Sequence, residues 1–144
     1  SAFAKTTENF EANQYYSVFV LGANGNYRNV IVKDELDSLA ATTGNAYVRY
    51  INAIPDSSEP AVTLTAAGTD LSNSNTAYAT VSDFTGVAPG DLTIKVSNGS
   101  TISATRTITV EKGKVYTVLL IGVPGSADAD KQVQVRFVTN GTVQ

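Results

Sequence analysis

Hydrophobic and polar residues alternate most clearly between residues 91 and 110. Leu92, Ile94 and Val96 are separated by polar residues, which is the pattern of a strand with one buried face. Asn98-Gly99 follows, and this pair favours the type I′ turn of a tight hairpin. Because the alternation continues to Val110, the segment predicts a β-hairpin.

The pattern predicts further strands on both sides of this hairpin. Residues 115–121 form a nearly continuous apolar run, as expected of a central strand covered on both faces. A loop over 123–130 and an alternating strand over 132–137 follow. Upstream, the sequence predicts strands over 46–54 and 61–66, a polar, turn-rich segment over 70–76 and a weaker strand over 77–84. Short strands separated by turn residues indicate an all-β, antiparallel β-sandwich.

The N-terminal residues predict a smaller β segment. Three strands are expected there, over 2–10, 15–21 and 29–33. Residues 34–41 predict a short helical turn, and Asp34 is expected to cap it.

The N-terminal segment is similar to the C-terminal one when the two are aligned at an offset of 100 residues. Between residues 10 and 22, four aligned pairs are identical: Glu11 and Glu111, Tyr16 and Tyr116, Val18 and Val118, Gly22 and Gly122. An internal repeat explains this match, although two unrelated β-meanders can also match by chance. The repeat predicts three parts: 1–36 as the C-terminal half of an upstream copy, 37–45 as a linker and 46–144 as a complete copy.

The partial copy needs a partner surface. Three strands bury one face only by packing on something else. Residues 1–36 are therefore expected to pair their strands with the complete copy in cis or with another chain in trans, since an open strand edge is a template for pairing.

The composition excludes several kinds of chemistry. The 144 residues include no Cys, His, Met or Trp, which removes thiol and imidazole catalysis, disulfides and metal sites built from Cys or His. The net charge of −3 argues against nucleic acid as a partner, because the phosphate backbone requires clustered Lys and Arg. No apolar run reaches the roughly 18 residues that span a membrane. Since Met is absent altogether, we expect a processed or truncated product.

Several stretches resemble the DUF4397 family of bacterial envelope proteins. They include Asn52-Ala53-Ile54-Pro55-Asp56 after a strand, Val87-Ala88-Pro89-Gly90 before an alternating strand, and Gly113-Lys114-Val115-Tyr116. The resemblance covers residues 46–138. It implies an exported β-sandwich module, often in tandem, in secreted proteins or lipoproteins of bacteria such as Bacteroidetes. The implied location is extracytoplasmic (periplasm, cell surface or secreted), and no activity, catalytic residue or cofactor carries over.

The chain as a whole is thus expected to be an immunoglobulin-like or transthyretin-like antiparallel β-sandwich with an extra N-terminal three-stranded segment. The motif residues are expected to be structural. Asn52 and Asp56 can hydrogen-bond nearby backbone groups in a turn, and Pro89-Gly90 favours a turn.

Tyrosines are the candidates for ligand binding. Four of them are expected to be partly exposed, where they could stack on a sugar ring of a glycan partner: Tyr15, Tyr16, Tyr27 and Tyr78. Packing within the strands is the alternative for each. Tyr47 and Tyr50, three apart on one strand, should face opposite sides, which places one of them in the core.

Acidic residues form two clusters. Asp128 and Asp130 could contribute to a Ca²⁺ site, but calcium needs about six to eight oxygen ligands, so a solvated loop is favoured and no metal is expected. The second cluster, over 34–37, fits the start of a helical turn. Asp37-Ser38-Leu39 resembles the short O-glycosylation signal of exported Bacteroidetes proteins.

These patterns predict a non-enzymatic, exported cell-envelope module with a structural, adhesive or protein-interaction role. One alternative is a module that binds a carbohydrate or another extracellular ligand through exposed Tyr. A second alternative is a hydrolase that uses a carboxylate pair, which would need two carboxylates about 5–10 Å apart in a cleft.

Overall fold

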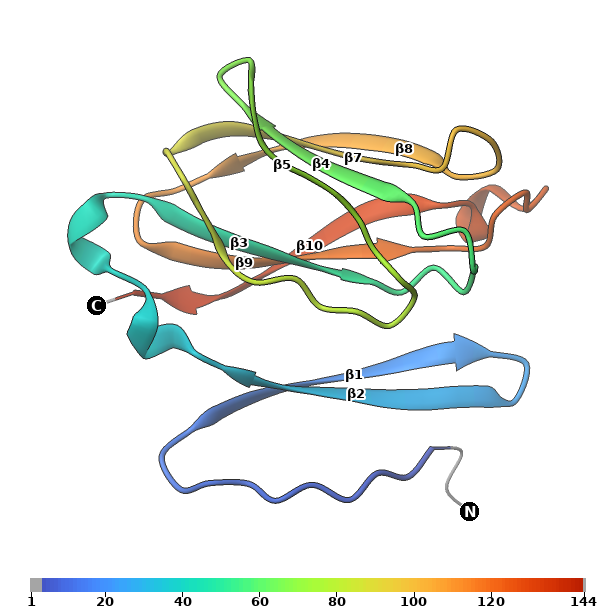
Figure 1. Cartoon of the computed structure of the whole chain (residues 1–144), viewed down its shortest axis with the longest axis horizontal. Helices are drawn as coiled ribbons and strands as arrows, with labels where there is room; N and C mark the ends of the chain where they lie inside the picture. Colours follow the sequence, from blue (N-terminus) through green and yellow to red (C-terminus); the bar gives the residue numbers. More distant parts are fainter. Residues whose placement is uncertain (1–3, 144) are drawn as a thin grey trace. The chain divides into compact units, whose positions relative to one another are not determined.

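The computed structural model describes residues 4–143, which form strands joined by turns and short 3₁₀ helices (Figure 1). The prediction of an all-β sandwich is confirmed. The chain divides into two compact units, Ser1–Leu39 and Ala40–Gln144. Each unit is described by itself below.

The larger unit is a sandwich of two four-stranded sheets (Figure 1). One sheet has the order β10-β9-β3-β6, and its strands are β3 (Ala46–Asn52), β6 (Thr85–Val87), β9 (Lys114–Ile121) and β10 (Gln134–Thr142). The other sheet has the order β5-β4-β7-β8, and its strands are β4 (Ala61–Ala66), β5 (Thr69–Asn75), β7 (Gly90–Ser97) and β8 (Ser103–Val110). Two 3₁₀ helices, η2 (Ala41–Thr43) and η3 (Ala129–Lys131), lie outside the sheets.

The core lies between these two sheets. Inward-facing residues alternate along β7, where Leu92, Ile94 and Val96 have no exposed surface. The predicted central strand is confirmed, because β9 has a neighbour on each edge and residues 115–118 are all buried. Burial of side chains of this size stabilises the fold by about 1.5–3 kcal/mol each.

Strand β3 carries the predicted pair of tyrosines. Tyr50 belongs to the core between the sheets, and burial raises the pKa of its phenol. Tyr47 points to the other side of the strand, where its hydroxyl donates to the Ala40 carbonyl oxygen at 2.7 Å.

The pairing of β3 with β9 differs from the purely antiparallel sandwich that the turns predicted. These two strands run parallel, with Tyr50 opposite Val118. Between them the chain forms β4 and β5 in the other sheet, returns to the first sheet for β6, forms β7 and β8 in the other sheet and then returns through β9. The parallel pair joins strands that are far apart in the sequence, so no local turn specifies it.

Two upstream segments differ from their predicted structures: the predicted turn region is a strand, and the predicted strand is not. The polar segment 70–76 belongs mostly to strand β5, which lies at a sheet edge and is largely exposed, so it needs few apolar residues. Residues 77–84 are not a strand, apart from a single bridge between Val81 and Ile51. The positive φ of Ala79, 65°, interrupts extended backbone there.

The β7–β8 hairpin is confirmed, but its turn is longer than predicted. Strand β7 ends at Ser97 and β8 begins at Ser103, so the connection is not a two-residue type I′ turn. The side chain of Asn98 organises this loop, because its Oδ1 accepts from the N–H groups of Ser100 and Ile102, both at 2.9 Å.

The smaller unit contains a hairpin of β1 (Tyr15–Ala23) and β2 (Asn26–Asp34). Its turn residues, Asn24 and Gly25, have φ values of 52° and 82°, as a type I′ turn requires. Helix η1 (Leu36–Ser38) follows β2 and confirms a short helical turn.

Two predictions for this unit are wrong. Residues 4–10 form no strand, so the described residues of this unit form a two-stranded sheet and not three strands. Residues 2 and 3 lie outside the described part. The stretch is mostly polar and has no alternating apolar face to tie it to the hairpin. Asp34 does not cap η1 either: Glu35 occupies that position, and Asp34 ends β2 and accepts from Ser17 Oγ at 2.7 Å.

Candidate functional site

Asn52 joins the end of β3 to the segment that follows β5. Its side chain is fully buried. The amide Nδ2 donates to the Thr76 carbonyl at 3.0 Å, and Oδ1 accepts from the Ile54 N–H at 3.0 Å. Both ends of the amide therefore bond to backbone groups, and nothing in this geometry leaves the side chain free for a ligand.

Asp56 and Pro89-Gly90 also act on local backbone. Asp56 Oδ1 accepts from the Ser58 N–H at 2.8 Å, and hydrogen bonds from Ser58 lower the pKa of this carboxyl group. Gly90 has a φ of 134° and begins β7 opposite Val110. These residues shape turns and do not bring reactive side chains together.

A buried arginine is the polar feature that the sequence analysis missed. Arg49 lies in the middle of β3 and is only 2% exposed. Its Nε donates to Thr117 Oγ1 at 3.0 Å, and its guanidinium lies 4.8 Å from the centre of the Phe84 ring. Thr117 in turn donates to Asn140 Oδ1. A basic residue inside the apolar run 46–54 was the available signal, since buried charges are held by partners.

The four candidate tyrosines do not form one platform. Tyr15 and Tyr16 are successive residues of β1 and therefore point to opposite faces of the hairpin. Tyr27 lies on the face of Tyr16, because it pairs with Gly22, and Tyr78 belongs to the other unit. The hydroxyl of Tyr16 is engaged, since it accepts from the Glu11 N–H at 2.9 Å.

The acidic candidates are bound to nearby groups. Asp128 caps η3, with its Oδ1 accepting from the Asp130 N–H at 3.0 Å, and it pairs with Lys131 at 3.5 Å. Within residues 4–143, no group of three or more His, Cys, Asp or Glu side chains could hold a metal ion.

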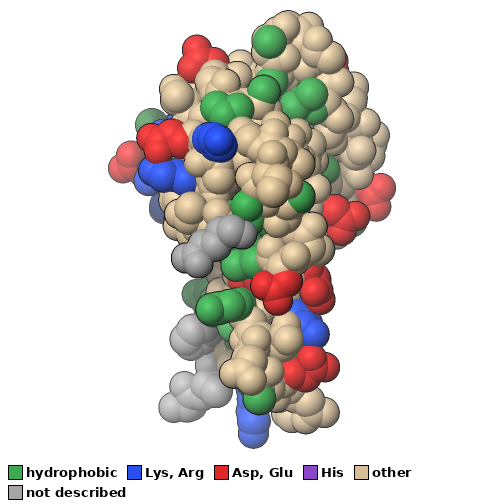
Figure 2. Space-filling view, turned by 90° about the vertical axis from the view of Figure 1, so that its left-hand side faces the viewer, with side chains coloured by type: hydrophobic (Ala, Val, Ile, Leu, Met, Phe, Trp, Pro, Cys, Tyr) green, Lys and Arg blue, Asp and Glu red, His purple; other side chains and the backbone are tan. Residues whose placement is uncertain are grey.

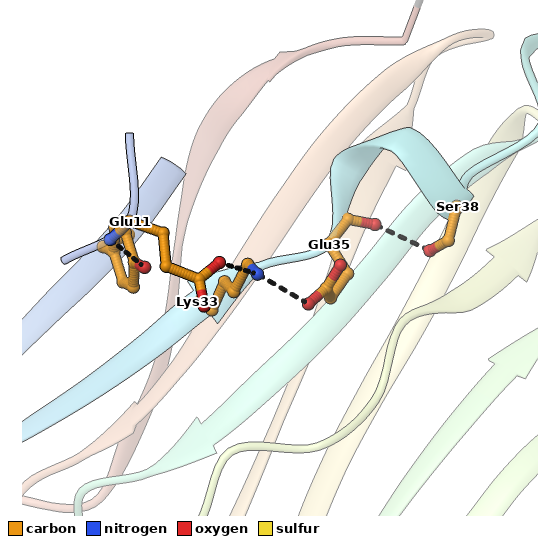
Figure 3. A network of polar contacts seen from close by, with 5 residues as sticks. Glu11, Lys33, Glu35 and Ser38 are labelled. Carbon is orange, nitrogen blue, oxygen red and sulfur yellow. Dashed lines mark hydrogen bonds and ion pairs between the residues drawn. The ribbon is translucent and has the colours of Figure 1, made fainter. Parts of the chain in front are cut away.

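The other acidic cluster takes part in an ion-pair network with Lys33 (Figure 3). Lys33 Nζ lies 2.7 Å from Glu11 Oε2 and 4.0 Å from Glu35 Oε1. The hydrogen bond to Glu11 raises the pKa of Lys33. The Glu35 carbonyl accepts from Ser38 Oγ at 2.7 Å, so the network joins the segment before β1 to the end of β2 and to η1.

One pocket in the sandwich has a volume of about 230 Å³. Its lining residues are uncharged and include no tyrosine: Thr101, Ser103, Val123, Gly125, Ser126, Gln132 and Val133. This pocket supplies neither the carboxylate pair of a hydrolase nor the aromatic surface on which a sugar ring would stack.

One face of the hairpin carries an apolar cluster beside Asn29 and Lys33. We call this cluster the apolar face and define it as Phe10, Tyr16, Val18, Val20, Tyr27 and Ile31. The β residues share one face, because Val18 pairs with Ile31 and Gly22 with Tyr27, and Phe10 packs edge-on against Tyr16 at 4.8 Å between ring centres. Several members are unusually exposed for their type: Phe10 61%, Val18 56%, Val20 53% and Tyr27 40%. Large hydrophobic side chains grouped in this way mark interaction surfaces.

The distribution of charged side chains on the surface shown in Figure 2 does not favour a polyanionic partner. Basic and acidic side chains are interspersed there, and neither sign forms a continuous patch. Among residues 4–143, no helix is both long and apolar enough to cross a bilayer.

Comparison with known proteins gives one family match. The model of a family described as "Domain of unknown function (DUF4397)" matches residues 46–142, which is the sandwich from β3 to the end of β10. No curated protein matches the chain.

Proposed function

We propose that the chain, which belongs to the DUF4397 family, is a non-enzymatic module of the bacterial cell envelope that acts by binding another protein segment. The observation that carries this proposal is the apolar face of the β1–β2 hairpin, on which Val18 and Val20 are more than half exposed. Covering such side chains in a complex releases their apolar surface from water, which favours association.

The chemistry of the chain supports a binding role over catalysis. The sequence supplies no imidazole and no thiol. In the acidic clusters, Asp128 accepts from a backbone N–H and Glu35 pairs with Lys33. Asn52 and Asp56, two residues of the motif shared with the DUF4397 family, bond to backbone groups of the sandwich. The sandwich thus supplies a rigid body, and the hairpin supplies the surface for contact.

The glycan alternative has weaker support. A sugar ring stacks on an aromatic side chain, and only Tyr16 and Tyr27 among the four candidates share a face. Aliphatic residues lie between them on that face, and such residues favour a protein partner.

Site-specific photo-cross-linking tests the proposal. A benzophenone amino acid is placed at Val20, and in a matched control at Leu71, which is 40% exposed on edge strand β5 of the other unit. In producing cells we expect a discrete protein adduct from position 20 and none from position 71. Protease treatment of intact cells, in the same experiment, checks whether the chain lies outside the cytoplasm.

A second variant makes the test specific for the apolar face. Val18→Ser, with the cross-linker still at position 20, should reduce the adduct several-fold. If position 20 gives no adduct, or if positions 20 and 71 give the same products, the hairpin is not the binding surface.

A further inference from the structure

We propose that the β1–β2 hairpin is the C-terminal hairpin of a second copy of the sandwich, and that its apolar face binds the first half of such a copy. This inference rests on the proposed function and names the partner: a segment equivalent to residues 46–103, carried N-terminal to the hairpin as in the complete copy. Four features of the two units support it.

The first shared feature is a tyrosine that holds the entry to its strand. Tyr116 of β9 accepts from the Glu111 N–H at 3.0 Å. Tyr16 of β1 accepts from the Glu11 N–H at 2.9 Å. In both cases the tyrosine hydroxyl fixes the residue five positions earlier, and the two contacts are separated by 100 residues, the offset of the sequence match.

The second shared feature is a glycine at the return of the chain. Gly22 and Gly122 have φ values of 119° and 109°. A Cβ atom on Gly22 would lie 1.9 Å from the Asn26 carbonyl oxygen, and one on Gly122 would lie 2.3 Å from that of Gln132. Both sites therefore need glycine for two reasons, the positive φ and the close approach of the returning backbone.

The third feature is the set of residues that share one face of β1 and of β9. The alignment places Tyr16, Val18 and Val20 on the positions of Tyr116, Val118 and Leu120. In the complete copy these three are 3%, 0% and 0% exposed, because the second sheet covers them. In the hairpin, Val18 and Val20 are 56% and 53% exposed. The same residue positions thus form a core in one unit and an exposed face in the other.

The fourth feature is the open edge of β1. In the complete copy β9 pairs with β10 on one edge and with β3, in parallel, on the other. Within residues 4–143, the hairpin forms a sheet of only two strands. A strand equivalent to β3 would fill the remaining edge of β1, and strands equivalent to β4 and β7 would cover the apolar face. Isolated hairpins are marginally stable, so this partner would also stabilise the hairpin.

The two hairpins differ in the length of their connections. Strands β1 and β2 are joined by Asn24-Gly25, whereas β9 and β10 are separated by residues 122–133. Length differences of this kind occur in surface loops while the strands keep their pairing. In both hairpins the aligned valine of the first strand lies opposite an apolar residue of the second: Val18 pairs with Ile31, and Val118 pairs with Phe137.

Extension of the full chain tests the inference. Residues 46–103 are added directly before residue 4, in the order that the offset of 100 dictates, and hydrogen exchange is measured across residues 15–34. We expect amide exchange in β1 and β2 to slow at least tenfold relative to the original chain. The matched control carries Leu92→Asp and Ile94→Asp in the added segment only, which prevents its sheet from forming, and should leave exchange unchanged.

A second arm does not depend on the added segment. If the two glycines have the same role, Gly22→Ala should accelerate exchange in β1 and β2, and Gly122→Ala should accelerate it in β9 and β10. Exchange in the extended chain that stays within twofold of the original, or a Gly22→Ala variant with unchanged exchange, would overturn the inference. A cross-link from position 20 in the same case would leave the proposed binding role intact and assign another partner.

Discussion

Asn52 shows how one buried polar side chain connects distant parts of the sandwich. Its bond from the Ile54 N–H spans two residues and follows from local sequence, because Asn favours such turns. Its bond to the Thr76 carbonyl joins residues 24 apart. That second partner could not be predicted, since it depends on where the segment after β5 lies.

Asn52→Ala is expected to lower the free energy of unfolding by about 2–4 kcal/mol, because it leaves two buried backbone groups without partners. Urea denaturation of the full chain measures this change. Asp56→Ala is the matched control: its partner, the Ser58 N–H, is exposed and can bond to water, so the loss should stay below about 1 kcal/mol. Equal losses in the two variants would show that burial of Asn52 is not what matters.

At the scale of elements, the hydrophobic pattern predicted strands that have one buried face. Strands β7, β8 and β9 were found from alternation or from a continuous apolar run. Edge strand β5 was missed, because a strand that is exposed on both faces carries polar residues such as Asn73 and Ser74. The segment 77–84 was wrongly predicted as a strand, because it contains apolar residues but pairs with another strand only through one bridge.

Gly122 is a position in the sandwich where a single substitution should disturb the pairing of two strands. Gly122→Ala is expected to destabilise the chain by about 1–3 kcal/mol, because the methyl group would meet the returning backbone. Gly141→Ala is the control, since no atom lies within 4 Å of its Cβ position, and it should change stability by less than about 1 kcal/mol. Thermal unfolding followed by circular dichroism compares the two; a harmless Gly122→Ala would contradict the close approach.

At the scale of the whole molecule, the core residues belong to one unit. Every member of the core cluster lies between Ala46 and Val135, inside the segment that the family model matches. The sandwich is therefore expected to fold by itself.

A shortened chain of residues 40–144 should unfold cooperatively, with a midpoint within about 3 °C of the full chain, because no residue of the core cluster is removed. Differential scanning calorimetry of both chains measures this. A midpoint lowered by more than about 10 °C would show that the hairpin contributes to the same cooperative core.

The sequence by itself determined the all-β class, most of the strands, the turn-forming motif residues and the match between the two segments. The class, the strands and the turns depend on residues that are close together in the chain, so alternation and turn chemistry reveal them. The match between the segments appears when the sequence is aligned with itself. The tertiary structure alone decided the parallel pairing of β3 with β9, the burial of Arg49 against Thr117 and Phe84, and the exposure of Val18 and Val20. These depend on which distant segments meet, because an apolar strand becomes core where a second sheet covers it and stays exposed where none does.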